Sequence, residues 1–293
     1  MTRPCQRQLS RQRFGPFPRF MFSIDALLKF AAALGACLSM LAAPAAMAAE
    51  FALAASPPRF VLQVKPGERT RHILEISNAS LEANTLSVKT ADWALTAEDT
   101  VTFYETLQPG SCRPWVLLER REFTVTNGRP YRFRFEIEVP ANAAPGECRF
   151  AIMLEGQEQM SRPSGGPAIP FSGRLGVVVY LALGDAAPNL SVVGSDVINV
   201  NGQATPVLKV RNTGNAHGRL GGFLSGTDAS GKALEFAPAS FPILPGETRA
   251  IALTATRPGD AETAVQVQFP VTVSGKLEWG KGQSQSVEQR FAP

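Results

Sequence analysis

Few residues in this 293-residue chain are of types that could carry catalytic or metal chemistry. There are two histidines, His72 beside an apolar run and His217 in a turn rich in Gly and Asn. Neither has a nucleophile or an orienting acid that its spacing identifies. No serine elbow, phosphate-binding loop, zinc-ligand spacing or dinucleotide fingerprint occurs in the sequence. We therefore expect no catalytic residue, no metal site and no cofactor, and we expect a binding or assembly protein rather than an enzyme.

Basic side chains form one dense group that could bind an anion. The group consists of Arg120, Arg121, Arg129, Arg132 and Arg134. On adjacent strands these guanidinium groups could contact an acidic partner or a chain-terminal carboxylate. The interpretation that we favour is an ordinary solvated face, because Glu119, Glu122, Glu136 and Glu138 are interspersed among the same positions.

The N-terminus has the order of a secretory signal. Arginines come first, an apolar run follows at 30–45, and small residues end at Ala48. This order predicts a signal peptide over residues 1–48 that is cleaved after Ala48, with translation starting at Met1 or Met21. A single membrane anchor, or a lipid anchor at Cys37, is the alternative. We expect a periplasmic protein, or else one at the cell surface or secreted.

Removal of the signal changes the charge and the cysteine count. Six basic residues and one acid leave with it, so the 29 basic and 25 acidic side chains become 23 and 24. A chain whose net charge is near zero does not attract nucleic acid through its overall electrostatic field, so we expect no nucleic-acid partner. Cys112 and Cys148 remain, and an even pair in an exported chain favours a disulfide. A metal or redox pair is the alternative, without a second CxxC or a nearby His to support it.

Short apolar strands recur with Gly, Pro and Asn between them, and no amphipathic helical pattern competes. Two blocks match: an apolar run ending at Asn78 or Asn212, together with a Pro-Gly-Glu turn and an alternating strand. We predict an all-β fold of two tandem immunoglobulin-like β-sandwich domains, 50–185 and 188–293. The expected strands are Arg59–Val64, Arg71–Ser77, Thr85–Trp93, Val101–Thr106, Trp115–Leu118, Glu122–Val125, Tyr131–Val139, Arg149–Glu155, Leu175–Leu183, Leu190–Val193, Pro206–Asn212, Arg219–Thr227, Ala233–Phe236, Phe241–Leu244, Arg249–Ala255, Ala264–Val273 and Gly282–Phe291.

The run Leu175–Leu183 is apolar on both faces of its strand. One face belongs to the core of the first domain. The other must meet the second domain or a partner strand added at the sheet edge. The segment between Gly156 and Pro170 has little to bury, and we expect it to be a mobile loop.

Three stretches carry a resemblance to a known family. Ser56–Phe60, Leu74–Asn78 and Ser87–Trp93 resemble the opening strands of the periplasmic pilus chaperones. The resemblance implies two immunoglobulin-like domains, with an arginine in the first strand and a lysine in the last strand of domain one holding the carboxylate end of a pilus subunit. Arg59 lies at the first of these positions. Val177 stands at the second, and the nearest base, Arg174, would lie on the opposite face.

We therefore expect a non-catalytic chaperone that binds a pilin-like or surface subunit by edge-strand addition. The strand Leu175–Leu183 would offer its backbone and three side chains, Val177, Val179 and Leu181, to this protein client. Arg59 would hold a charged terminus, Arg174 is the other basic candidate, and the mature chain would not span a membrane. The alternative is a structural or adhesive cell-envelope protein whose sandwiches are spacers without a client.

Overall fold

The computed structural model describes residues 52–96, 100–161, 167 and 169–293. The predicted signal peptide, 1–48, lies outside the described residues and stays a prediction. Within these ranges the regular elements are strands, apart from one short 3-10 turn, η2 (Arg113–Trp115). No helix in the described ranges has the length and apolar character needed to cross a bilayer.

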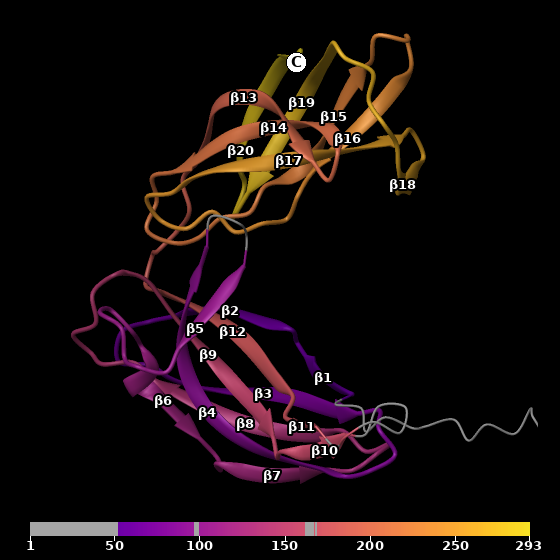
Figure 1. The fold of residues 1–293 in the computed structure, drawn as a ribbon. Coiled ribbons are helices and arrows are strands. Elements are labelled where there is room, and N and C mark those ends of the chain that lie inside the picture. Colours follow the sequence, from indigo (N-terminus) through magenta and orange to yellow (C-terminus); the bar gives the residue numbers. More distant parts are fainter. Residues whose placement is uncertain (1–51, 97–99, 162–166, 168) are drawn as a thin grey trace, which may run out of the picture. The chain divides into compact units, whose positions relative to one another are not determined.

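The first half of the chain forms two sheets that face each other (Figure 1). One has the order β1-β3-β8-β6, and the other has the order β2-β12-β9-β4-β5, with β7 also paired to β4. A small hairpin, β10–β11, follows β9. The strands are β1 (Leu53–Ser56), β2 (Arg59–Val64), β3 (Arg69–Asn78), β4 (Asn84–Leu95), β5 (Val101–Tyr104), β6 (Val116–Leu118), β7 (Glu122–Val125), β8 (Tyr131–Glu138), β9 (Gly146–Gly156), β10 (Gln159–Ser161), β11 (Ile169–Phe171) and β12 (Arg174–Leu183).

The second half has the strand order β13-β14-β17-β16-β15-β19-β20, with β18 paired to β17. Strand β17 pairs with β14 through its first half and with β16 through its second, so it joins two layers around one core. The strands are β13 (Leu190–Val200), β14 (Gln203–Asn212), β15 (Gly221–Thr227), β16 (Ala233–Pro238), β17 (Thr248–Arg257), β18 (Asp260–Ala264), β19 (Val271–Trp279) and β20 (Gln283–Phe291). The all-β, two-sandwich prediction is confirmed in its fold class.

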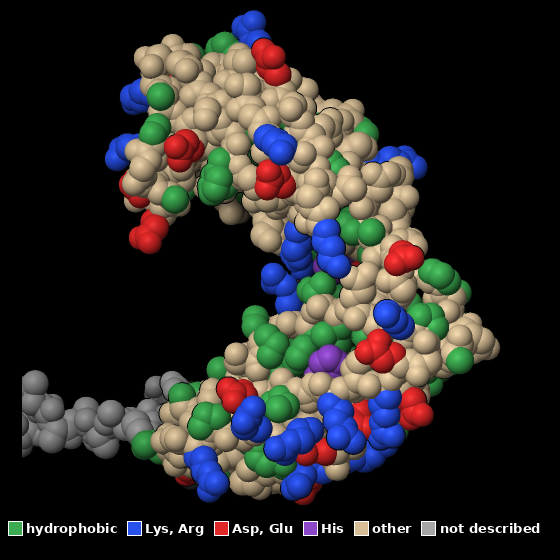
Figure 2. All heavy atoms as spheres, turned by 180° about the vertical axis from the view of Figure 1, so that it is seen from behind, with side chains coloured by type: hydrophobic (Ala, Val, Ile, Leu, Met, Phe, Trp, Pro, Cys, Tyr) green, Lys and Arg blue, Asp and Glu red, His purple; other side chains and the backbone are tan. Residues whose placement is uncertain are grey.

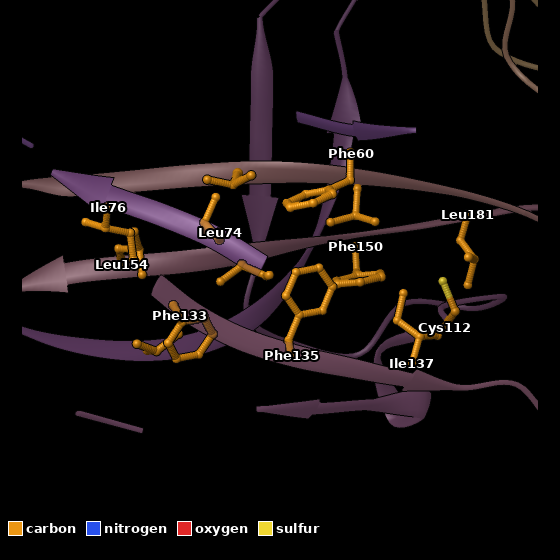
Figure 3. Close-up of a cluster of buried hydrophobic side chains, with 14 of the residues drawn as sticks. Phe60, Leu74, Ile76, Cys112, Phe133, Phe135, Ile137, Phe150, Leu154 and Leu181 are labelled. Atoms are coloured by element: carbon orange, nitrogen blue, oxygen red, sulfur yellow. The ribbon is translucent and has the colours of Figure 1, made fainter. Parts of the chain in front are cut away.

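Each half has its own apolar core. In the first, strand β8 shows the reason most clearly, because Phe133, Phe135 and Ile137 alternate with charged residues and point inward from the strand. Figure 3 shows these side chains facing Phe60 and Phe150 of the opposite sheet. In the second half, Phe236 and Phe291 are fully buried among aliphatic side chains. Both cores belong to the same compact unit of the chain.

The two matching sequence blocks adopt the same local structure. In both Pro-Gly-Glu turns the glycine has a positive φ, +80° at Gly67 and +79° at Gly246. In both, the following glutamate accepts a hydrogen bond from the backbone N–H three residues earlier, at 2.9 Å for Glu68 and 3.0 Å for Glu247. The repeat that the sequence suggested is therefore a structural repeat.

The two strand-ending asparagines are also equivalent. Asn78 and Asn212 are buried, and each donates two side-chain hydrogen bonds to backbone carbonyls of neighbouring segments. A buried amide with its donors satisfied fixes where those loops meet the strand end.

The cysteine pair forms a disulfide, Cys112–Cys148, with the two Cα atoms 5.8 Å apart. It ties the loop before η2 to strand β9 in the first core. The expectation of a disulfide is confirmed.

Several expected elements are wrong in detail. Ala264–Val273 is not one strand, because the chain leaves the sheet after β18 and re-enters it at Val271. Phe241–Leu244 makes only an isolated bridge through Ile243. The expected loop Gly156–Pro170 contains strand β10 and most of β11. Strand β1 was missed because its four residues, Leu53–Ser56, are too short and too rich in alanine to show a pattern.

Candidate functional site

Strand β12 is paired on both sides along only part of its length. It pairs antiparallel with β9 from Arg174 to Leu183. Its parallel pairing with β2 begins at Val178, opposite Arg59. In the described part of the chain no strand pairs with Arg174–Val177 on that side. We call this four-residue segment the open edge; it leaves backbone N–H and C=O groups available to an added strand.

The three side chains expected to face a client lie in the protein's own core. Val177, Val179 and Leu181 are fully buried. Figure 3 shows Leu181 pointing toward Cys112 and Ile137. The expectation that these side chains are offered to a partner is corrected, because this row of β12 faces the opposite sheet. The backbone of the open edge is a separate feature and is unaffected.

The other row of β12 is covered by aromatic side chains. Tyr180 packs edge-on against Trp93 of β4, with ring centroids 5.1 Å apart. Phe103 of β5 lies against Gly176, so closely that a Cβ atom at position 176 would be 2.5 Å from its Cζ. Trp93 and Tyr180 form a third apolar cluster with neighbouring residues of β4 and β9 and with Leu244. Both faces of β12 are therefore largely covered. The outer face is covered mainly by residues of β4, β5 and β9, together with Leu244 from the second half of the chain, rather than by a second domain or a partner strand as expected.

Arg59 and Arg174 differ in their surroundings. Arg59 is exposed at the start of β2, where the β2–β12 pairing begins. Arg174 is held by Glu155 at 2.8 Å, and Glu155 also binds Lys89 at 3.1 Å. Lys89 in turn binds Glu105, which follows β5, at 2.7 Å, so the ion pairs run across three strands. Arg174 is therefore already neutralised, and Arg59 is the better candidate for binding an anion.

Sequence reasoning missed a cluster around Tyr180. His217 stacks on the Tyr180 ring at 3.8 Å between centroids. The guanidinium of Arg219 lies 5.9 Å from the centre of the same ring. Burial lowers the pKa of Arg219, and the charge of Arg59 lowers it further. The guanidinium groups of Arg59 and Arg219 therefore repel each other, and a bound carboxylate would stabilise both positive charges.

The dense arginine group predicted from sequence is a solvated face. Exposed ion pairs link Arg132 to Glu75 and Arg134 to Glu119. Figure 2 shows blue and red side chains intermingled over the first sandwich. Such exposed pairs contribute little free energy each, so the face is best explained as ordinary protein surface.

Within the described residues, no group of three or more His, Cys, Asp or Glu side chains is placed to hold a metal ion. Two pockets, of about 520 Å³ beside β14 and β17 and about 530 Å³ beside Trp115, are lined by a mixture of polar and apolar residues.

No family model matches the chain, and no curated protein matches it either. Solved structures do. The class 5 fimbriae chaperone CfaA is 13% identical and covers 82% of this chain and 99% of its own, with a TM-score of 0.41. A chain of the Salmonella enterica SafA pilin–SafB chaperone complex is 12% identical to this chain, with a TM-score of 0.44. The match covers 82% of this chain and 97% of the other. A chain of the CsuC–CsuE pre-assembly complex of Acinetobacter baumannii is 15% identical to this chain, with a TM-score of 0.41. The match covers 82% of this chain and 99% of the other.

Proposed function

We propose that this protein is an exported, non-catalytic chaperone that binds an extended segment of a pilin-like or surface subunit. The observation that carries the proposal is the half-paired strand β12, whose open edge adjoins the exposed Arg59. The proposal includes two domains, 50–185 and 188–293, a cleaved signal over 1–48, and a periplasmic location.

The direction of the neighbouring strand suggests how a client segment would lie. Strand β2 runs parallel to β12 and starts at Arg59. A client strand beside Arg174–Val177 that also ran parallel to β12 would point its carboxyl end toward Arg59. A carboxylate there would accept charge-assisted hydrogen bonds from a guanidinium, each of which contributes about 1.5–3 kcal/mol. Arg219 is the second basic group close enough to influence it.

The hairpin beside the open edge extends an apolar surface toward the client. Met160 of β10 and Ile169 of β11 are both more than half exposed. Both belong to the hairpin that joins β9 to β12. Side chains of this kind suit an apolar segment that is waiting for its final partner.

Site-directed photocrosslinking in the native cell tests this function. A photoreactive phenylalanine analogue at Ser172, which is exposed just before β12, should crosslink to one exported subunit. The same analogue at Phe223, exposed on the second sandwich, should not. Arg59→Ala should reduce the yield about tenfold, matching the loss of one charge-assisted contact. Arg59→Lys should restore part of the yield, and Arg257→Ala should leave it unchanged. Equal crosslinking from both positions, or none from Ser172, would reject the proposal.

A spacer protein without a client is the second candidate. It is favoured by the burial of Val177, Val179 and Leu181, which removes these side chains from any partner. In that case the open edge would be an ordinary sheet edge, and the photoreactive group at Ser172 would find no specific partner.

A further inference from the structure

A cleft of about 520 Å³ opens in the second sandwich, where strands β14 and β17 separate. The two strands pair along Val207 to Arg211 of β14. One residue before Val207, the same register would bring Pro206 opposite Leu253. Proline has no N–H to donate to a ladder, and Leu253 pairs with β16 instead. The proline therefore marks the place where the two strands part.

The first residues of β14 have an unpaired side. Among the described strands, Gln203–Pro206 pairs with β13 alone, and we call this segment the β14 edge. The turn before it, Asn201-Gly202, has positive φ at both positions, 51° and 83°, as in a type I′ hairpin. In such a hairpin the residues that flank the turn exchange both of their backbone hydrogen bonds. The N–H and C=O of Ala204, one position further on, therefore point away from β13, on the side where Ala204 lines the cleft.

Another wall of the cleft belongs to the connection between β18 and β19. Its apolar side chains, Val265, Val267 and Phe269, pack against the second core and alternate with exposed glutamines. The N–H of Val265 donates to the carbonyl of Ala255 at 2.8 Å. The next two residues also line the cleft and pair with no strand in the described part of the chain. Two segments that lack a strand partner therefore border one cleft.

Among the described residues, no charged side chain lines the cleft. The polar side chains that line it are amides and hydroxyls, from Asn201, Gln203, Thr205, Thr254 and Gln266. They can hydrogen-bond to peptide groups but cannot neutralise a charge. Leu253 and Ala255 of the second core also line the cleft and suit an apolar side chain. Because an unpaired charge is costly to bury, this lining fits a neutral occupant.

We propose that the cleft binds an extended, uncharged peptide segment of a partner protein as a strand added at the β14 edge. The segment would exchange backbone hydrogen bonds with Ala204 and direct an apolar side chain toward Leu253. A volume of about 520 Å³ is within the range of ligand sites in proteins. The site lies wholly within the second sandwich and needs neither Arg59 nor the open edge of β12. It is therefore a second binding site, separate from the one under the proposed function.

Nuclear magnetic resonance titration of the mature chain with short peptides tests this site. The neutral probe acetyl-Val-Thr-Val-Thr-Val-amide, added to about 2 mM, should cause saturable shifts of the amides at 200–206, 252–255 and 264–267. The same peptide N-methylated at every residue should bind about tenfold more weakly, because it cannot donate to the carbonyl of Ala204. Replacing the central valine of the probe by glutamate should also weaken binding about tenfold, because the cleft offers no cation.

Matched variants of the protein come from β18. Ala264 and Ala261 are both exposed, but only Ala264 is among the residues that line the cleft. Ala264→Trp should fill the cleft and abolish the shifts, whereas Ala261→Trp should leave them unchanged. Ala204→Pro removes the N–H that points toward the cleft and should weaken binding about tenfold.

Three results would overturn the proposal. These are the absence of saturable shifts in the natural chain, equal binding by Ala264→Trp and Ala261→Trp, and equal binding of the probe and its N-methylated form. The comparison of the two peptides uses the natural chain, so it is decisive even where a substitution disturbs the fold. Crosslinking from Ser172 reports on the open edge of β12, so failure of this site and failure of the proposed function can be told apart.

Discussion

Glu147 of β9 holds His217 through two contacts, a hydrogen bond from the His217 backbone N–H at 3.0 Å and a 2.5 Å contact between Glu147 Oε2 and the ring Nδ1. Both side chains are almost completely buried. The acid belongs to the first half of the chain and the histidine to the second, so one carboxylate links the two.

Replacing this acid should loosen that link. Glu147→Ala leaves two buried donors of His217 without their acceptor, which costs about 1–3 kcal/mol for each unsatisfied group. We expect a lower urea midpoint, measured by tryptophan fluorescence. Asp196→Ala, which removes an exposed ion pair with Lys209, is the control and should change stability by less than about 0.5 kcal/mol. Equal effects of the two substitutions would contradict the importance of burial.

Val179→Glu should unfold the first sandwich rather than affect binding alone. Val179 is fully buried, and a carboxylate there has no partner, so the loss should exceed about 3 kcal/mol. Val193→Glu in β13, where the valine is more than half exposed, should be tolerated. Thermal unfolding followed by circular dichroism measures both. A folded Val179→Glu protein with native stability would show that this row of β12 is not in the core.

The disulfide should contribute substantially to stability. Cys112 and Cys148 are 36 residues apart in the chain, and closing a loop of this length stabilises by about 4 kcal/mol in the chain-entropy model. The Cys112→Ser/Cys148→Ser protein should have a free energy of unfolding lower by about that amount, which appears as a lower urea midpoint. Dithiothreitol should lower the midpoint of the natural chain and have no effect on the double variant. An unchanged midpoint after complete reduction would contradict this prediction.

His72 should make stability fall in mild acid. Its ring packs against Phe60 and Phe135, and burial lowers its pKa below the ordinary value of 6.5. The unfolded chain therefore takes up a proton first, and stability that is complete above pH 6.5 is lost as the pH falls toward the folded pKa. Urea midpoints at intervals between pH 7 and about 5 measure the loss, since carboxylates titrate lower.

The variant His72→Gln should flatten the midpoint over this interval. Glu136→Gln is the matched control, because Arg69 and Arg71 lower the pKa of Glu136 and its contribution is lost only below about 4.5. The same slope in the natural chain and in His72→Gln would assign the pH dependence to another group.

Sequence patterns predicted most strands because alternation in a half-buried sheet leaves a clear signal. Strand β8 is the best example, since its charged and apolar residues occupy opposite faces. The same reasoning failed for β12, where both rows are apolar and nothing local distinguishes the row that faces the opposite sheet. The row that contains Gly176 is identified as the outer one only by the long-range approach of Phe103 to this glycine. The glycine itself was the one local signal of that approach.

The candidate site was predicted only in part. Arg59 was found from the resemblance of its surroundings to known opening strands. Arg219, Tyr180 and His217 come together from segments far apart in the chain, and no spacing rule connects them. The ion pair between Arg174 and Glu155 could not be predicted from the sequence either, because it depends on the register between β9 and β12.

The parallel pairing of β2 with β12 has a consequence for how the chain is made. Arg59 is synthesised early, and its partner Val178 emerges only after most of the first sandwich. Until then β2 has no partner strand, and pairing between segments so far apart in the sequence is slow to form. Until β12 has been made, the growing chain carries an unpaired strand, so the yield of folded protein should depend on factors that delay aggregation of newly made polypeptides.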